Sequence, residues 1–265
     1  MSNRRPFLAR LFAASALAAG LAVVHAAEVV RLGVTAGPHA QIAEVARKVA
    51  ARDGIDLHIV EFQDYIRPNA ALDAGDLDAN SYQHLPFLDS QIQARGYKIS
   101  AVGFTVAFPM GFYSRRVKSL AELPRGAKVG IPNDPSNSGR ALQLLQKAGV
   151  LKLKATAGIG ATAADIVDNP KGLQIVQLEA AQLARSLDDL DASAINTNYA
   201  MQAGLVPTRD AIAIEDAHGP WANLIAVRSA DRDKPWVAKL VKAFQSPEVK
   251  SFVTDKFSGS MVPAF

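Results

Sequence analysis

The sequence predicts an α/β protein with mostly parallel sheet, in which strands alternate with helices. The chain has 265 residues, of which 49% are hydrophobic and 20% are charged, enough for one large domain or two of medium size. Apolar runs of strand length alternate along it with segments in which apolar residues recur at helical spacing. The sequence contains no cysteine, which excludes disulfide frameworks, thiolate metal sites and cysteine nucleophiles.

The positive charge of the chain is concentrated at its start. The formal net charge is +4, but Arg4, Arg5 and Arg10 lie in a first segment that has no acidic residue. Without these three, 26 basic residues face 25 acidic ones after position 26. A nearly neutral body offers no surface that could follow a phosphate backbone, so we expect no nucleic-acid partner.

Residues 1–26 have the pattern of a cleaved export signal, with a basic start, an apolar stretch over 11–24 and small residues near the end. An N-terminal membrane anchor is the alternative, although the apolar stretch is short for a bilayer. Residues 3–8 also resemble a twin-arginine signal, so both export routes stay open. Because no cysteine is available for lipidation, we expect a periplasmic protein without a lipid anchor that begins near Ala27.

The elements follow in order along the mature chain. A buried strand is predicted at 28–34, and apolar residues at helical spacing over 42–49 predict a helix that ends at Asp53 and Gly54. A second strand at 57–62 completes a β-α-β unit. Further strands are predicted at 98–104, 128–131, 174–178, 192–196 and 224–227, and further helices at 139–148, 162–167 and 236–244.

No Gly/Ser-rich linker separates the two halves of the chain. Two domains without such a linker are most simply joined by crossing segments within extended strands. We place these crossings near 106–112 and 217–222.

The first candidate site is the segment 133–140, which follows a strand and opens a helix. Ser136 or Ser138 is expected as the N-cap. A helix start offers free N–H groups, and Arg140 adds a planar fork that matches a carboxylate. The alternative is a capped helix with a surface arginine. If Arg140 holds a ligand, replacing it by alanine should weaken binding more than tenfold and leave the fold intact.

Aromatic side chains gather at the predicted strand ends, where open α/β sheets bind ligands. They could wall an apolar side chain, or they could be core packing, which we prefer for Phe87 and Phe112. His84 has no acid or second histidine at metal spacing, so no metal is expected there. The aromatic candidates are Tyr65, Tyr82, His84 and Phe108.

Side-chain amides form the third cluster, at Asn196, Asn198 and Asn223. An amide can accept from an ammonium and donate to a carboxylate, so amides beside one arginine suit a zwitterion. The alternative is ordinary turn chemistry. Residues 158–163 match the dinucleotide pattern G-x-G-x-x-A, but no convincing strand precedes them, and no nucleotide or other cofactor is expected. Hydrolase, metalloprotease and Walker motifs are absent from the sequence.

Several runs resemble those of the NlpA family, the methionine-binding proteins of bacterial ABC importers. The resemblance covers essentially the whole mature chain in order. It is carried by residues 34–39, 64–65, 68–69, 75–80, 83–84, 132–135, 178–180, 185–189 and 195–197.

This resemblance implies a two-lobed periplasmic-binding fold with a cleft between lobes joined by two crossing strands. We expect residues 27–106 and 223–265 in one lobe and 107–222 in the other. By the family's pattern, Arg140 holds the carboxylate of methionine or a similar amino acid, the three asparagines meet its head group, and Tyr65, Tyr82 and His84 flank its side chain. The implied partners are the importer's permease subunits, and we expect a monomer that is not an enzyme.

Three positions depart from the family pattern, since Val106, Tyr82 and Trp221 stand where other residues are common. They leave the side-chain specificity open. The alternatives are another apolar amino acid, a D-isomer, a methionine-containing peptide, or a periplasmic enzyme that acts on an amino acid.

Overall fold

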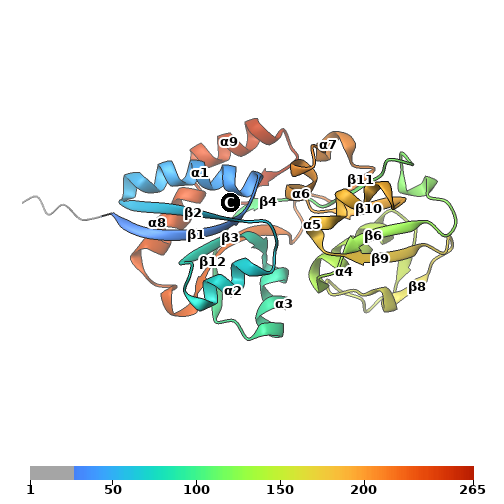
Figure 1. Ribbon diagram of the computed structural model, residues 1–265, viewed down its shortest axis with the longest axis horizontal. Coiled ribbons are helices and arrows are strands. Elements are labelled where there is room, and N and C mark those ends of the chain that lie inside the picture. Colours follow the sequence, from blue (N-terminus) through green and yellow to red (C-terminus); the bar gives the residue numbers. More distant parts are fainter. Residues whose placement is uncertain (1–26) are drawn as a thin grey trace, which may run out of the picture.

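The structure is a computed structural model that describes residues 27–265, and the predicted export signal at 1–26 lies outside the described residues. The chain forms two main sheets, each with helices around it, that lie side by side along the long axis of the molecule (Figure 1). The α/β class and the two-lobed arrangement are confirmed.

The first sheet has six strands in the order β13-β4-β12-β3-β1-β2. Helices α1, α8 and α9 cover one face, where Leu32, Ile42 and Phe244 belong to one buried cluster, and α2 and α3 cover the other. The strands are β1 (Glu28–Thr35), β2 (Ile55–Phe62), β3 (Ala79–His84), β4 (Ile99–Ala107), β12 (Ala222–Arg228) and β13 (Val262–Pro263). The helices are α1 (Pro38–Ala50), α2 (Arg67–Ala74), α3 (Leu85–Arg95), α8 (Pro235–Phe244) and α9 (Pro247–Phe257).

The second sheet has five strands in the order β11-β5-β10-β6-β9. The apolar face of α4 packs on it, with Leu142 and Leu145 fully buried against Ile131. The strands are β5 (Gly111–Tyr113), β6 (Lys128–Pro132), β9 (Gln174–Leu178), β10 (Ala192–Ile195) and β11 (Ala213–Ile214), and β7 (Lys152–Leu153) pairs separately with β8 (Ile166–Asp168). The helices are α4 (Pro135–Lys147), α5 (Ala180–Leu183), α6 (Thr197–Gln202) and α7 (Pro207–Asp210).

The predicted strands are confirmed, but their directions are more mixed than predicted. β1 pairs in parallel with β2 and β3, whereas β12 runs antiparallel to both β3 and β4. The reason is topological, since β12 returns from the second sheet in the opposite direction. The helix predicted at 162–167 is wrong, because this segment forms a short 3-10 turn, Ala163–Asp165, followed by β8.

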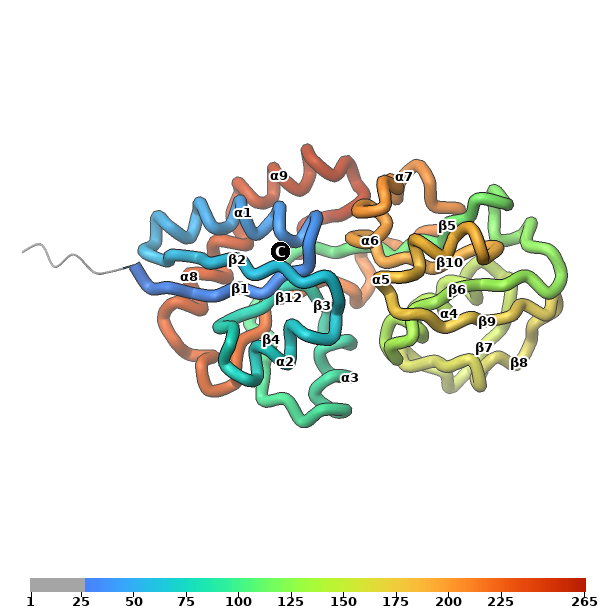
Figure 2. The backbone as a smooth tube through the Cα atoms, viewed as in Figure 1, coloured from blue at the N-terminus to red at the C-terminus, as the bar shows by residue number. Residues whose placement is uncertain are grey.

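Two segments connect the sheets, residues 108–110 on the way out and 215–221 on the way back, close to the predicted crossings (Figure 2). They lie beside each other, because Ala222 pairs with Ala107 and the Glu215 N–H donates to the Met110 carbonyl at 3.0 Å. The exact division into lobes stays a prediction.

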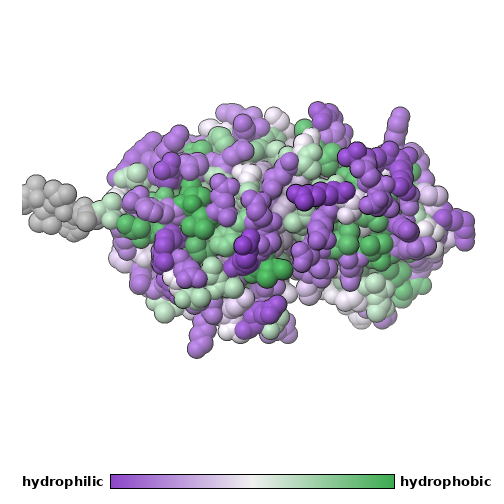
Figure 3. Space-filling model, in the orientation of Figure 1, coloured by the Kyte–Doolittle hydropathy of each residue, from purple (hydrophilic) through white to green (hydrophobic). Residues whose placement is uncertain are grey.

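The face seen in Figure 3 carries hydrophilic side chains over both sheets, with apolar ones in small groups between them. Within residues 27–265, none of the helices combines the length and apolar character that crossing a membrane requires.

Candidate functional site

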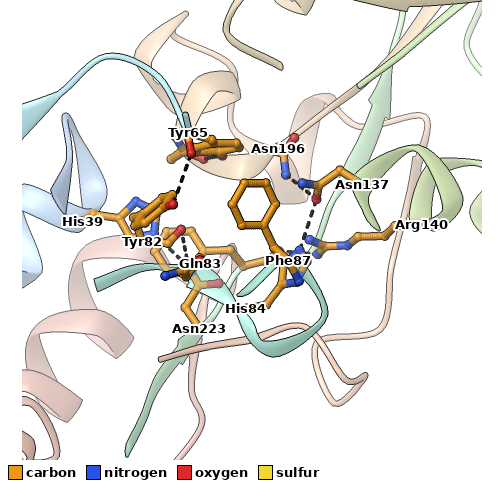
Figure 4. Close-up of a pocket in the computed structure, with 12 residues that line it drawn as sticks. His39, Tyr65, Tyr82, Gln83, His84, Phe87, Asn137, Arg140, Asn196 and Asn223 are labelled. Atoms are coloured by element: carbon orange, nitrogen blue, oxygen red, sulfur yellow. Dashed lines mark hydrogen bonds between the residues drawn. The ribbon is translucent and has the colours of Figure 1, made fainter. Parts of the chain in front are cut away.

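A pocket lies between the two sheets and is lined by residues of both. The structure brings together in it all eight residues singled out in the sequence, namely Tyr65, Tyr82, His84, Phe108, Arg140, Asn196, Asn198 and Asn223. Four further residues line it, His39, Gln83, Phe87 and Asn137. Arg140 enters from one end, and Tyr65 and Tyr82 lie at the other (Figure 4).

The cationic end is built around Arg140, in the second turn of α4 and only 2% exposed. Its Nε donates to both carboxylate oxygens of Glu215 at 2.8 Å, and its Nη2 donates to the Phe108 carbonyl at 2.7 Å. The Trp221 ring lies against the guanidinium, with Cζ 4.8 Å from the ring centroid. Arg140 is therefore a buried, fixed cation and not a surface arginine.

The helix that carries Arg140 begins earlier than predicted. Its N-cap is Asp134, whose side chain accepts from the Asn137 N–H at 2.9 Å, and Pro135 occupies the first turn. The expectation of Ser136 or Ser138 as the cap is wrong, because both already lie in the helix.

A chain of hydrogen bonds fixes the orientation of the polar groups next to Arg140. The Asp134 carboxylate only accepts, so the Asn137 amide must direct its Nδ2 at it, 3.0 Å away. The Asn137 Oδ1 then accepts from His84 Nε2 at 3.2 Å. His84 Nδ1 in turn accepts from the Phe87 N–H at 3.1 Å, which assigns the proton to Nε2.

Two asparagines of the pocket each have one side-chain atom without a partner. Asn196 donates through Nδ2 to Asn137 Oδ1 at 3.1 Å, so its Oδ1 remains. Asn198 Oδ1 accepts from the Tyr65 hydroxyl at 2.5 Å, so its Nδ2 remains. Within residues 27–265, this acceptor and this donor are buried without hydrogen-bond partners, although such groups are normally satisfied. Both belong to residues that line the pocket.

The two histidines of the pocket are neutral at physiological pH. Burial, helped by the positive charge of Arg140, lowers the pKa of His84 to about 3. Burial alone lowers the pKa of His39 to about 3. His39 lies 2.7 Å from Thr35 Oγ1 through Nδ1 and 2.8 Å from Asn223 Nδ2 through Nε2, so Nε2 is the acceptor.

Rings form the apolar end. The centroids of Tyr65, Tyr82 and Phe87 lie 5.9 to 6.0 Å from one another at tilted or edge-on angles, and Phe108 stacks on His39 at 4.2 Å. The Tyr82 hydroxyl donates to the Tyr65 carbonyl at 3.1 Å. Burial raises the pKa of both tyrosines well above the usual value, so they are uncharged.

Sequence reasoning missed several parts of this site. His39 and Gln83 lie in the runs that carry the family resemblance, and Asn137 lies in the candidate segment 133–140, but nothing local distinguished them from turn or core residues. Phe87, interpreted as core, also lines the pocket, whereas Phe112 is core as predicted. Glu215 could not be found, because its partner Arg140 is 75 residues away.

Two features of the sequence find a structural explanation outside the pocket lining. Val106 packs in the core of the first sheet, and Trp221 lies behind Arg140 and against His84, so neither departure from the family pattern lies in the pocket wall.

The segment 158–163 packs on α4, where a Cβ on Gly139 would lie 2.2 Å from the Ile159 carbonyl oxygen. No long helix follows this segment, so it lacks the context of a dinucleotide site.

Comparison with known proteins agrees with this geometry. The model of the NlpA lipoprotein family matches residues 30–265. A D-methionine-binding lipoprotein MetQ of Escherichia coli is 49% identical over 236 residues, which are 88% of this chain and 87% of the relative. These relatives are named as binding proteins and not as enzymes.

Solved structures are equally similar. A nutrient-binding protein from Burkholderia cenocepacia bound to methionine is 57% identical, with a TM-score of 0.87 over 89% of this chain and 100% of that one. An ABC transporter periplasmic substrate-binding protein from Coxiella burnetii is 50% identical, with a TM-score of 0.86 over the same shares.

These names overturn one prediction. The matching family and the Escherichia coli relative are described as lipoproteins, which contradicts the expectation of a protein without a lipid anchor. That expectation rested on the missing cysteine alone. The absence of a cysteine excludes lipidation at that residue type, but it does not show whether the protein is attached to a membrane.

Proposed function

The chain belongs to the NlpA lipoprotein family, and we propose that it binds methionine as the substrate-binding protein of an ABC importer. The observation that carries this proposal is the composition of the pocket. A buried guanidinium lies at one end and rings surround the other, and two buried amide atoms without partners belong to residues that line the pocket. A zwitterionic head group and an apolar side chain would satisfy both ends at once.

In this proposal the carboxylate of the ligand accepts from the Arg140 guanidinium and from Asn198 Nδ2. The ammonium donates to Asn196 Oδ1. Asn223, whose Nδ2 is engaged by His39, presents its own oxygen to the same ammonium. These contacts would remove the cost of leaving two buried polar atoms unpaired.

The side chain of methionine would then lie among Tyr65, Tyr82, Phe87 and Phe108. Thioether sulfur interacts favourably with ring edges, and unbranched methionine adapts to a pocket of irregular shape. His84 hydrogen-bonds Asn137, so we place it beside the head group and not beside the side chain.

Ligand binding is proposed to close two lobes on each other. The first lobe consists of residues 27–106 and 223–265, and the second of residues 107–222. Contacts from both lobes support this, since the Tyr65 hydroxyl reaches Asn198 and Gln202 Nε2 reaches the Ala36 carbonyl at 2.8 Å. The pocket residues are buried except for the half-buried Tyr65, so we propose that a ligand enters when the lobes separate. We propose that the closed form acts as a monomer and is recognised by the permease subunits.

Calorimetry with L-methionine, D-methionine and leucine tests the proposal. We expect a dissociation constant of about 1 μM or lower for methionine, which corresponds to about 8 kcal/mol. Leucine, similar in size but without sulfur, is the control and should bind at least tenfold more weakly. Equal binding of leucine would favour the alternative of a general apolar amino-acid carrier, and absence of binding to all three would contradict the proposal.

A further inference from the structure

Glu215 holds Arg140 from behind the pocket, and nothing in the sequence motifs marks it. It directly follows β11, on the segment that returns to the first sheet. Both of its carboxylate oxygens lie 2.8 Å from Arg140 Nε, and Oε2 lies 2.5 Å from Nη2. Oε2 also accepts from the Met110 N–H at 2.7 Å. With side chains only 2% and 10% exposed, Arg140 and Glu215 form a buried, hydrogen-bonded ion pair.

The pair determines which part of the guanidinium a ligand can reach. The hydrogen bonds of Arg140 to described residues start from Nε and Nη2, toward Glu215 and the Phe108 carbonyl. Trp221 covers one face of the group. Nη1 is therefore the nitrogen left for a ligand carboxylate, and its position is fixed before any ligand binds.

The pair also determines the charge of the pocket. Arg140 is the only charged side chain among the described residues that line it, because both histidines and both tyrosines there are neutral. Asp134, a nearby carboxylate outside the lining, accepts from the first turn of α4 and from the Asn137 amide. Glu215, which is hydrogen-bonded directly to the guanidinium, therefore neutralises the charge of Arg140.

We infer that Glu215 determines specificity: it fixes the guanidinium and neutralises it, so that the pocket selects a zwitterionic amino acid over an anionic analogue without the ammonium. This inference rests on the proposed function. A lone carboxylate near Arg140 is attracted by the guanidinium and repelled by Glu215, so Glu215 reduces its net gain. The ammonium of an amino acid adds an attraction to Glu215, which the analogue lacks.

The test compares two ligands that differ only at this group, L-methionine and 2-hydroxy-4-(methylsulfanyl)butanoate, which has a hydroxyl in place of the ammonium. Calorimetry on the wild-type chain should show a strong preference for methionine. In Glu215→Gln the dissociation constant of the hydroxy acid divided by that of methionine should fall on the order of tenfold. The reason is that the attraction of Glu215 to the ammonium is lost and its repulsion of both ligands' carboxylates is relieved. The matched control is Asp216→Asn, which removes the adjacent carboxylate, 66% exposed, and should change the ratio less than twofold.

A second variant covers the case in which Glu215→Gln does not fold, because a buried arginine without its partner is destabilising. Glu215→Asp keeps the charge but draws it away from Arg140. It should weaken the binding of both ligands more than threefold and leave their ratio within about twofold of wild type.

The outcomes separate this inference from the proposed function. A wild-type chain that binds no methionine contradicts the proposed function. A wild-type chain that binds methionine but not in preference to the hydroxy acid, a folded Glu215→Gln variant with an unchanged ratio, or a Glu215→Asp variant with unchanged affinities overturns only the role of Glu215.

Discussion

The two ends of the pocket are held in different ways. At the polar end each group is oriented by the next, from Asp134 through Asn137 to His84, and Arg140 is fixed by Glu215. At the aromatic end Tyr65 and Tyr82 each make one hydroxyl hydrogen bond, and their rings contact each other with about 6 Å between centroids. Directional bonds allow one arrangement, whereas ring contacts tolerate small shifts. The polar end should therefore dictate the head group, and the aromatic end should only shape the side-chain space.

The polar end also joins the two sheets. His84 ends β3 of the first sheet, while Asn137 and Asn196 follow strands of the second. The hydrogen bond from His84 Nε2 to Asn137 Oδ1 forms only when both sheets are in place, whereas the bond from Asn196 Nδ2 to the same oxygen joins two residues on the side of the second sheet. Changes at this end should therefore affect both ligand binding and the closed arrangement.

The largest effect is expected from Arg140→Ala, which removes the centre of the polar end. Methionine affinity should fall more than tenfold, measured by calorimetry. The free energy of unfolding should also fall by about 3 to 5 kcal/mol in chemical denaturation, because Glu215 stays buried without its partner. The sequence alone predicted that the fold stays intact, and the ion pair with Glu215 is the reason to expect a loss of stability as well.

Arg209→Ala is the matched control for that loss of stability. Arg209 also pairs with a carboxylate, that of Asp210, but its side chain is 68% exposed. An exposed pair contributes about 0 to 1 kcal/mol. If both variants unfold at the same denaturant concentration, the polar end is not held by a buried ion pair.

A second large effect is expected from acid, because both ends of the pocket contain a buried neutral histidine. The pKa values of His39 and His84 are lowered to about 3, while in the unfolded chain they return to about 6.5. Between these values the unfolded chain binds protons that the folded chain excludes. The free energy of unfolding should therefore fall as the pH decreases from 6 to 4, by up to about 1.4 kcal/mol per pH unit for each histidine.

Variants isolate this contribution from that of the carboxylates. His84→Gln should make the slope of stability against pH less steep, whatever its effect on stability at pH 7. His58→Gln is the control, since that side chain is 56% exposed, and its slope should match that of the wild type. Equal slopes in all three proteins would mean that the polar end does not exclude protons.

The parts of this molecule that could be predicted from sequence are those with a local cause. The strands over 128–132 and 192–195 are short apolar runs that can be found locally. Arg140 and Asn196 follow their carboxyl ends, which is where open α/β sheets bind ligands. The residues that depend on distant partners could not be predicted. Glu215 matters only because Arg140 lies beside it, and His39 only because Asn223 and Phe108 meet its ring.

Errors in the prediction have the same origin. Residues 162–167 carry a helix-like start, and the structure does contain a capping box at Thr162, but the chain continues into β8 after one 3-10 turn. Pairing between β7 and β8 decides this outcome, and a single short segment gives no sign of it.

The smallest effect is expected at the aromatic end, from Tyr82→Phe. This change removes one hydroxyl, which donates to the Tyr65 carbonyl, and keeps the ring that faces the pocket. Stability should fall by about 1 kcal/mol, and the dissociation constant for methionine should stay within threefold of wild type. The contrasting variant is Tyr65→Phe, whose lost hydroxyl holds Asn198 by its Oδ1 and so orients the unpaired Nδ2 of that amide. Calorimetry should therefore show a weaker affinity in Tyr65→Phe than in Tyr82→Phe, and the reverse order would show that ring placement matters more than the orientation of the amides.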